Sequence, residues 1–316
     1  MASTSPTPTN LPLGKVLAST EKKTRDKAIK NLSIFLSQSG ENAIPKPEMD
    51  KLWKGIFYCF WMSDKPLVQQ ALASELAELL LSIPSNAESL AFLLGFWETL
   101  VREWNGIDRL RMDKYYMLVR RFVNASFRLM LRAKWDKKTL EQYNEILTRQ
   151  GGPLCHTDTK VPTSLAYHLA DIYLEELEKV LAQQSDIDKQ PPVPLILVLN
   201  PFLVLATQTA SKITFRRIQS ALLQPLLDSL SLESGSDDED EARPRKRARL
   251  SQNIPIWHNR SCLRDSATEK PLPRDVLQKQ IRRALFDCAS RPDTRDSSRR
   301  KLYALWKEGE GSEEDD

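Results

Sequence analysis

Glycine is scarce in this chain, at 10 of 316 residues. That scarcity disfavours folds built on many tight turns and on phosphate-cradling glycine loops. Leucine dominates the apolar residues and runs of β-branched residues are few, which favours helices over strands. The sequence therefore predicts an all-α protein, long enough to bury one large core or two small ones.

Clustered metal ligands are missing as well. The four cysteines, Cys59, Cys155, Cys262 and Cys288, lie far apart, with no CxxC pair and no histidines at ligand spacing. A zinc site needs thiolates and imidazoles that converge on one ion. We therefore expect neither a metal nor a cofactor, and we expect reduced cysteines, as in nuclear or cytosolic proteins.

The sequence also lacks the short motifs that carry catalysis. It has no P-loop, dinucleotide-binding GxGxxG, HExxH, GxSxG or zinc-deaminase pattern. His156 follows Cys155 directly, but thiol–imidazole dyads are assembled through space and rarely from adjacent residues. We predict a protein that is not an enzyme, and acid–base catalysis by paired carboxylates is the weaker alternative.

Membrane and secretion signals are not found either. The first 15 residues, MASTSPTPTNLPLGK, contain no apolar core of a secretory signal. The most apolar run, 193–206, is interrupted by Asn200 and Pro201 and is too short to span a bilayer. The expectation is a soluble protein.

Apolar residues at helical spacing are what the chain does contain. The pattern predicts successive helices at about 15–39, 47–62, 66–83, 88–103, 105–134, 136–149, 162–184, 193–207 and 211–231. In the loop 63–66, Ser63 or Asp64 is expected to cap the helix that Pro66 begins. Short linkers between long helices favour a HEAT/armadillo-like array of antiparallel helix pairs; because no clean repeat is visible, a compact irregular bundle is the alternative.

Composition divides the chain into five segments. They are a disordered N-terminus at 1–14, a helical repeat-like domain at 15–232, a disordered acidic/basic linker at 233–252, a basic C-terminal extension at 253–308 and an acidic tail at 309–316. The extension holds a short amphipathic helix around 273–290 and is too small for its own core. We expect it to dock on the main domain or on a partner.

Charge is unevenly distributed along the chain. Residues 101–140 carry a net charge of +7, residues 251–308 carry +6 and the last eight residues carry −5, within a total of +4. The linker contains five cations in seven residues that match a nuclear-import signal: Arg243, Arg245, Lys246, Arg247 and Arg249. An import receptor is therefore an expected partner, and the alternative is a solvated charge run.

The stretch WNGIDRLRMDKYYMLVRR (104–121) places five cations among large apolar residues. On a helical projection, residues such as Leu118 and Phe122 form an apolar face. Arg111 falls within that apolar face and is expected to pair with Asp108 or Glu103. The opposite half carries the cations Arg109, Arg120, Arg121, Arg128 and Arg132, with Lys114 at its edge. A face this rich in arginine suits phosphates or a partner's carboxylates, and structural ion pairing is the alternative.

A second basic segment, SSRRKLYALWK, adds three candidate RNA- or acidic-partner-binding residues: Arg299, Arg300 and Lys301. The aromatic cluster LWKGIFYCFWMSDKPL is a different case. Its rings fall on more than one helix face, so packing between helices is favoured over base stacking.

Three blocks together resemble the ribosomal RNA-processing protein 1 family. They are LWKGIFYCFWMSDKPLVQQALA (52–73), WNGIDRLRMDKYYMLVRRFV (104–123) and RRKLYALWK (299–307). The resemblance implies an all-helical HEAT-like domain in the nucleus and nucleolus, acting without catalysis on early precursors of the large ribosomal subunit. It implies a scaffolding role in maturation of large-subunit and 5.8S rRNA.

The partners that the resemblance implies are large-subunit pre-rRNA and three pre-60S assembly factors: a Brix-domain factor, a WD-repeat factor and a small zinc-containing factor. The residues alone leave another function open, a protein-only nuclear adaptor that binds acidic segments of its partners.

Overall fold

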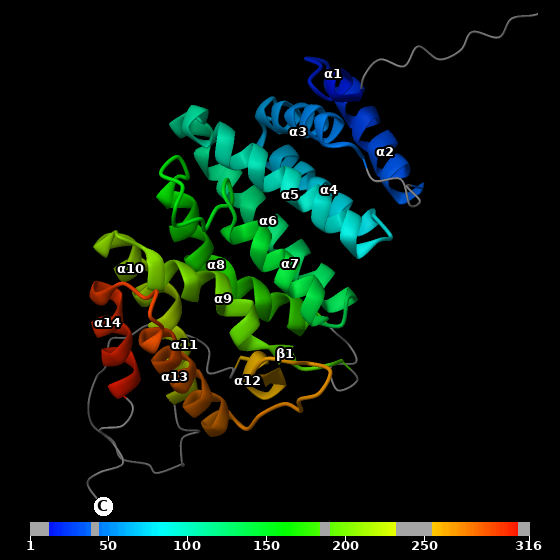
Figure 1. Ribbon diagram of the computed structural model, residues 1–316. Helices are drawn as coiled ribbons and strands as arrows, with labels where there is room; N and C mark the ends of the chain where they lie inside the picture. Colours follow the sequence, from blue (N-terminus) through cyan, green and yellow to red (C-terminus); the bar gives the residue numbers. More distant parts are fainter. Residues whose placement is uncertain (1–12, 39–43, 184–189, 232–254, 309–316) are drawn as a thin grey trace, which may run out of the picture. The chain divides into compact units, whose positions relative to one another are not determined.

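The computed structural model describes residues 13–38, 44–183, 190–231 and 255–308 (Figure 1). The described chain is mainly helical, with two strands of two residues each, which confirms the all-α prediction. Serial stacking of the HEAT type is not established by these contacts and stays a prediction. No helix of the described part is both long and apolar enough to cross a bilayer.

The chain forms two compact units, 1–133 with 149–162, and 134–148 with 163–316. Unit 1 contains α1 (Leu13–Leu17), α2 (Lys22–Gln38), α3 (Lys46–Trp61), α4 (Pro66–Ser82), α5 (Asn86–Glu103), a 3₁₀ turn η1 (Trp104–Gly106) and α6 (Arg109–Arg132). Helix α6 packs along α4, while α3 packs on α5 and α1. The predicted disordered segments 233–252 and 309–316 lie outside the described residues, and so does 1–14 except for its last two.

Unit 2 contains α7 (Lys137–Thr148), α8 (Thr163–Ala182), α9 (Leu195–Gln208), α10 (Lys212–Ile218), a π-helical turn η3 (Gln219–Leu223), α11 (Gln224–Ser231), α12 (Trp257–Arg260), α13 (Arg274–Ser290) and α14 (Asp296–Lys307). Two short strands, β1 (Val193–Pro194) and β2 (Ser261–Cys262), pair in parallel. The expected helix at 211–231 is therefore interrupted by a π turn. Helices α13 and α14 of the C-terminal extension pack on α9, and α13 also packs on α11.

Local capping chemistry explains several helix starts. Ser85 accepts a hydrogen bond from the backbone N–H of Glu88, three residues on, and Asp108 accepts one from Arg111 in the same way. The expected cap at Ser63 or Asp64 is wrong: Lys65 precedes α4 without a side-chain cap, and Pro66 occupies the first turn. The Ser63 hydroxyl instead donates to Phe60 O at 2.6 Å, so it serves the end of α3.

The core of unit 1 is aromatic. Trp53 lies against Phe92 and Phe96, with ring centroids 4.5 and 5.6 Å away, and Phe96 stacks on Phe122 at 3.8 Å. Helix α5 can approach this closely because Gly95 has no side chain: a Cβ there would lie 2.3 Å from Trp53 Cδ1. The aromatic cluster of 52–67 thus contributes to helix packing, and Tyr58 is the one of its aromatic residues that is exposed.

Candidate interaction surfaces

Helix α6 carries most of the predicted binding residues, and its N-terminus is held by an ion pair. The Arg111 guanidinium contacts the Asp108 carboxylate, as expected from the sequence, and lies 4.8 Å above the Trp61 ring. Arg111 also lowers the pKa of Asp108 by hydrogen bonding to the carboxylate. This arrangement places the first turn of α6 against the end of α3.

Lys114 does not lie on the surface as the helical projection suggests. Its side chain is 5% exposed, and Nζ donates to Phe60 O at 3.0 Å, Trp61 O at 2.8 Å and Ser63 O at 2.7 Å. Burial lowers its pKa to about 8, with a smaller contribution from Arg111, so the ammonium is still protonated at neutral pH. Two of the three N–H bonds serve the last carbonyls of α3 and the third serves Ser63 O just beyond it, which leaves none for a ligand.

Arg128 and Arg132 are also used within unit 1. Arg128 forms a two-contact ion pair with Glu78 of α4. Arg132 donates to four acceptors at distances of 2.9–3.1 Å: Leu81 O, Ile83 O, Asn86 Oδ1 and Ser89 Oγ. Partial burial lowers the pKa of Arg132. Three cations of α6, Lys114, Arg128 and Arg132, each contact a residue 50 or 51 positions earlier in the chain. Because this offset is nearly constant, α4 and α6 run side by side in the same direction.

The other cations of α6 differ from these. Arg109 and Arg121 are exposed, and neither has a hydrogen-bond or ion-pair partner within the described residues. Arg120 is half-buried. The arginine face expected from the sequence is therefore largely a set of contacts to α3 and α4, with two exposed guanidinium groups beside it.

The C-terminal basic segment shows the same division. Arg299 donates to Arg291 O and Thr294 O, both at 3.1 Å, and Lys301 Nζ lies 4.6 Å above the Phe215 ring. Arg300 is exposed and has no partner within the described residues. The nuclear-import cations Arg243, Arg245, Lys246, Arg247 and Arg249 lie outside the described residues.

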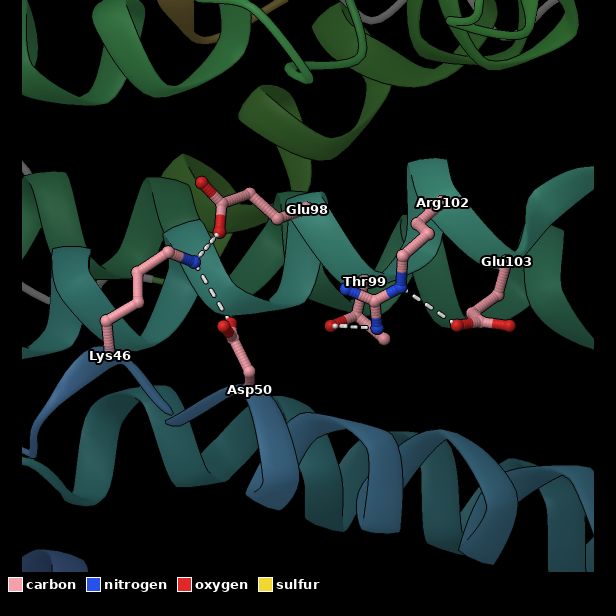
Figure 2. Close-up of polar contacts among 6 residues, drawn as sticks. All are labelled: Lys46, Asp50, Glu98, Thr99, Arg102 and Glu103. Carbon is pink, nitrogen blue, oxygen red and sulfur yellow. Dashed lines mark hydrogen bonds and ion pairs between the residues drawn. The ribbon is translucent and has the colours of Figure 1, made fainter. Parts of the chain in front are cut away.

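Another polar cluster of unit 1 connects α3 with α5 (Figure 2). Lys46 Nζ lies 2.5 Å from Glu98 Oε2 and 3.0 Å from Asp50 Oδ1, and its pKa is raised chiefly by hydrogen bonding to Glu98. On the same side of α5, Arg102 Nε donates to Glu103 Oε1 at 2.9 Å. These groups neutralise one another at an exposed site, where such pairs stabilise only slightly.

The sulfur and imidazole groups are placed for packing. All four cysteines are free and buried, and burial raises the pKa of Cys59 to about 11 and of Cys262 to about 12. A thiol with so high a pKa is a poor nucleophile. His258 is 1% exposed, its Nε2 lies 3.1 Å from Ser229 Oγ, and burial together with Arg274 lowers its pKa to about 4. Within the described ranges, no three His, Cys, Asp or Glu side chains converge as a metal site.

Two exposed cations were not predicted from the sequence. Lys212 and Arg216 lie on α10, outside 101–140 and 251–308, the two segments with a high net positive charge. A shorter window could have found them, because 212–218 contains three cations and no carboxylate.

The described residues define an all-helical protein with basic surface groups and an interior packed with leucine and aromatic side chains. The pattern of the family described as "Nucleolar protein, Nop52" matches residues 8–305. The chain therefore belongs to the Nop52 family of nucleolar proteins, which confirms the family resemblance and the expected nucleolar location.

Named relatives agree with that assignment. "Ribosomal RNA processing protein 1 homolog A" of Mus musculus is 34% identical over 230 residues, which are 72% of this chain and 45% of the relative. Homolog B of Homo sapiens is 34% identical over 224 residues, 70% of this chain and 28% of the relative. Human homolog A is 27% identical over 328 residues, covering 94% of this chain and 69% of the relative. The chain thus spans less than half the length of the first two relatives.

Proposed function

We propose that this protein is a non-enzymatic ribosome biogenesis factor that acts in ribosomal RNA processing on the nucleolar precursor of the large subunit. The observation that carries the proposal is the family match, which extends over 8–305 and so includes both units and the C-terminal extension. The relatives named for ribosomal RNA processing align with most of the chain, which supports the same role here.

In this proposal, "processing" means scaffolding. The helical units would hold pre-rRNA and assembly factors together during maturation of large-subunit and 5.8S rRNA, in a HEAT-like array. The proposed protein partners are the Brix-domain, WD-repeat and small zinc-containing factors of the pre-60S particle, with an import receptor for the linker cations. Buried thiols of raised pKa and a buried neutral imidazole support a role that does not involve nucleophilic catalysis.

A protein-only adaptor is the second candidate, and the α4–α6 face favours it. Leu67 and Leu110 are 79% and 93% exposed. Glu78 shares a face of α4 with Leu67, and Arg128 shares a face of α6 with Leu110, by the i+3/i+4 rule. Because Glu78 and Arg128 contact each other, the two leucines lie on adjoining faces. Exposed leucines next to the unpaired Arg121 suit an amphipathic protein segment that carries a carboxylate.

Depletion of the protein tests the proposal. Loss of the chain should cause precursors of large-subunit and 5.8S rRNA to accumulate, with small-subunit rRNA unaffected, and the protein should co-sediment with pre-60S particles. Normal large-subunit maturation after complete depletion would exclude the proposed function. Rescue by the full chain should be retained after Cys155→Ser with His156→Gln, because neither residue has a catalytic role in this proposal.

A comparison of two variants separates the scaffold from the adaptor. If the adaptor alone is correct, Leu110→Asp should abolish association with a partner protein while ultraviolet crosslinking of the chain to RNA is absent even in the wild type. If the scaffold is correct, wild-type crosslinks to pre-rRNA are present, and Leu110→Asp leaves them unchanged.

A further inference from the structure

Helices α10 and α14 come together in unit 2 although they are far apart in sequence (Figure 1). Lys301 of α14 lies over the Phe215 ring of α10. The start of α14 is tied to the end of α9, because Arg295 donates from its backbone N–H to Thr207 O at 3.1 Å and from Nε to Gln208 O at 2.7 Å. Both contacts place the basic segment of α14 alongside α10.

The register of α10 directs two cations toward α14. Phe215 and Ile218 are buried, while Lys212 and Arg216 are exposed and one turn apart. At 100° per residue, Lys212 and Arg216 lie on the side of the exposed face next to Phe215, where Lys301 is seated. Arg217 lies on the other side and pairs with Asp171 of α8 at 2.6 Å.

Helix α14 continues the same row of charge. Its buried positions are Ser298, Leu302 and Leu305, so Lys301 is at the edge facing α10 and Arg300 points to solvent. Ser297 and Ala304 are exposed on the outward side of α14, and both are small. A chain lying across this face could therefore approach the helix closely between cations from two elements.

We propose that Lys212, Arg216, Arg300 and Lys301 form a binding surface for the phosphate backbone of single-stranded RNA. The inference rests on the proposed function, because it names where that scaffold would hold its RNA. Cations from two adjacent helices can contact successive phosphates along one strand. Arginine supplies bidentate contacts to phosphate oxygens, and lysine supplies point charges.

Two of the nearby carboxylates are paired with other arginines, while Asp293 is held by the neutral Gln208 amide and keeps its charge. Asp171 is paired with Arg217, Asp293 accepts a hydrogen bond from Gln208, and Asp296 lies 3.7 Å from Arg299. Glu308 is exposed at the C-terminal end of α14 and bounds the surface there. The four cations therefore present an excess of positive charge to a polyanion.

The surroundings favour RNA over an acidic protein segment. The centres of protein interfaces are usually built around large aromatic or aliphatic anchors. Here the residues between the cations of α14 are Ser297 and Ala304. The one large apolar side chain of α10 that is strongly exposed, Ile213 at 70%, lies between Arg216 and Arg217, at the border of the surface away from Lys212. A phosphate backbone needs charge and close approach, which this surface provides.

The test uses the purified full chain and a labelled single-stranded RNA of about 24 nucleotides and mixed sequence. The variant neutralises three cations, with Lys212→Gln, Arg216→Gln and Arg300→Gln, and leaves Lys301 on Phe215. Each lost phosphate contact removes about 0.7 from the salt slope of single-strand binding. Three losses should lower that slope by about 2 and weaken binding about 50-fold at roughly 150 mM salt.

The matched control changes the same charge elsewhere, with Lys23→Gln, Lys27→Gln and Lys30→Gln on the exposed face of α2. It should alter RNA affinity less than about threefold, since scattered cations add only a general field. Ultraviolet crosslinking of the wild-type chain, which needs no variant, should map RNA to peptides containing 212–218 and 296–307.

Three results would overturn the inference. They are equal losses in the two triple variants, an unchanged salt slope, or crosslinks that avoid both peptides. A polyglutamate peptide serves as the second probe. If the α10–α14 variant loses polyglutamate binding but keeps RNA binding, an acidic protein segment is the occupant and the inference is wrong. None of these results affects the depletion test, so the two proposals can fail separately.

Discussion

Replacing Lys114 with methionine tests whether this residue supports the fold or binds a ligand. The change keeps an unbranched side chain of similar length and removes the ammonium that bridges α6 to the end of α3. Phe60 O keeps a donor in the Ser63 hydroxyl, and Ser63 O keeps the Gln69 amide. Within the described residues, Trp61 O is left without any donor.

The size of the effect follows from these contacts. A partly buried carbonyl that loses its partner costs up to about 1–3 kcal/mol. Two further charge-assisted hydrogen bonds disappear, but their acceptors keep other donors. Relief from burying the ammonium offsets part of the loss. We expect Lys114→Met to lower the free energy of unfolding by about 2–4 kcal/mol. For a unit of this size the melting temperature should fall by about 6–15 °C.

Thermal and urea unfolding, followed by circular dichroism, measure the change. Arg121→Met is the matched control, because Arg121 is on the same helix and exposed, and it should alter stability by less than about 0.5 kcal/mol. Folded Lys114→Met protein at low temperature should bind the 24-nucleotide RNA as the wild type does. Unchanged stability together with a large loss of RNA affinity would refute the structural role assigned to Lys114.

Three further predictions concern His258, Gly95 and Arg132, which are buried or already make contacts within the fold. The pKa of His258 is lowered to about 4, below its unfolded value, so its contribution to stability is complete above about pH 6.5 and is lost as the pH falls. Between pH 6.5 and 4, the free energy of unfolding should therefore fall by about 3 kcal/mol more in the wild type than in His258→Gln. Equal pH dependences in the two proteins would contradict the assignment. Gly95→Ala should destabilise the protein by about 1–3 kcal/mol despite the better helix propensity of alanine, because the new Cβ would meet Trp53. Calorimetry measures the change. Gly106→Ala is the control, because nothing lies within 4 Å of a Cβ at that position. In urea unfolding, Arg132→Met should destabilise the protein by about 2–3 kcal/mol, because Leu81 O and Ile83 O lose a charged donor. Arg109→Met should be nearly neutral. A larger loss of stability in Arg109→Met than in Arg132→Met would show that Arg132 is not a structural residue.

Local signals in the sequence located most helices, although the expected helix at 15–39 is wrong: α1 and α2 are separate helices there. Pro66 in a first turn and the apolar period of α6 each depend on a few neighbouring residues, so they can be read without tertiary information. Pairing of Arg111 with Asp108 belongs to the same class, because the two residues are three apart on one helix.

The roles of individual cations could not be read in that way. Lys114 lies at the edge of the polar arc in projection, and only the end of α3, more than fifty residues earlier, converts it into a buried donor. The π turn at 219–223, which follows α10 and packs on α8, was likewise not predicted, because the apolar period continues through it. The role of a cation and the position of a π turn depend on which helix packs against that segment, and the periodicity of the sequence does not contain this information.

A cation serves a partner only with donors that the fold has not already used. In α6 the acceptors are carbonyls at helix ends and a carboxylate of α4, so three of its charges contribute to stability, and a partner would have to break those contacts first. On α10 and α14, the neighbouring carboxylates are satisfied by other residues, and the cations between them are not. Neutralising equal numbers of cations on the two faces should therefore have opposite consequences, with stability lost on α6 and RNA affinity lost on α10 and α14. That contrast follows from hydrogen-bond satisfaction alone, because both segments have the same sign of charge and a similar abundance of arginine.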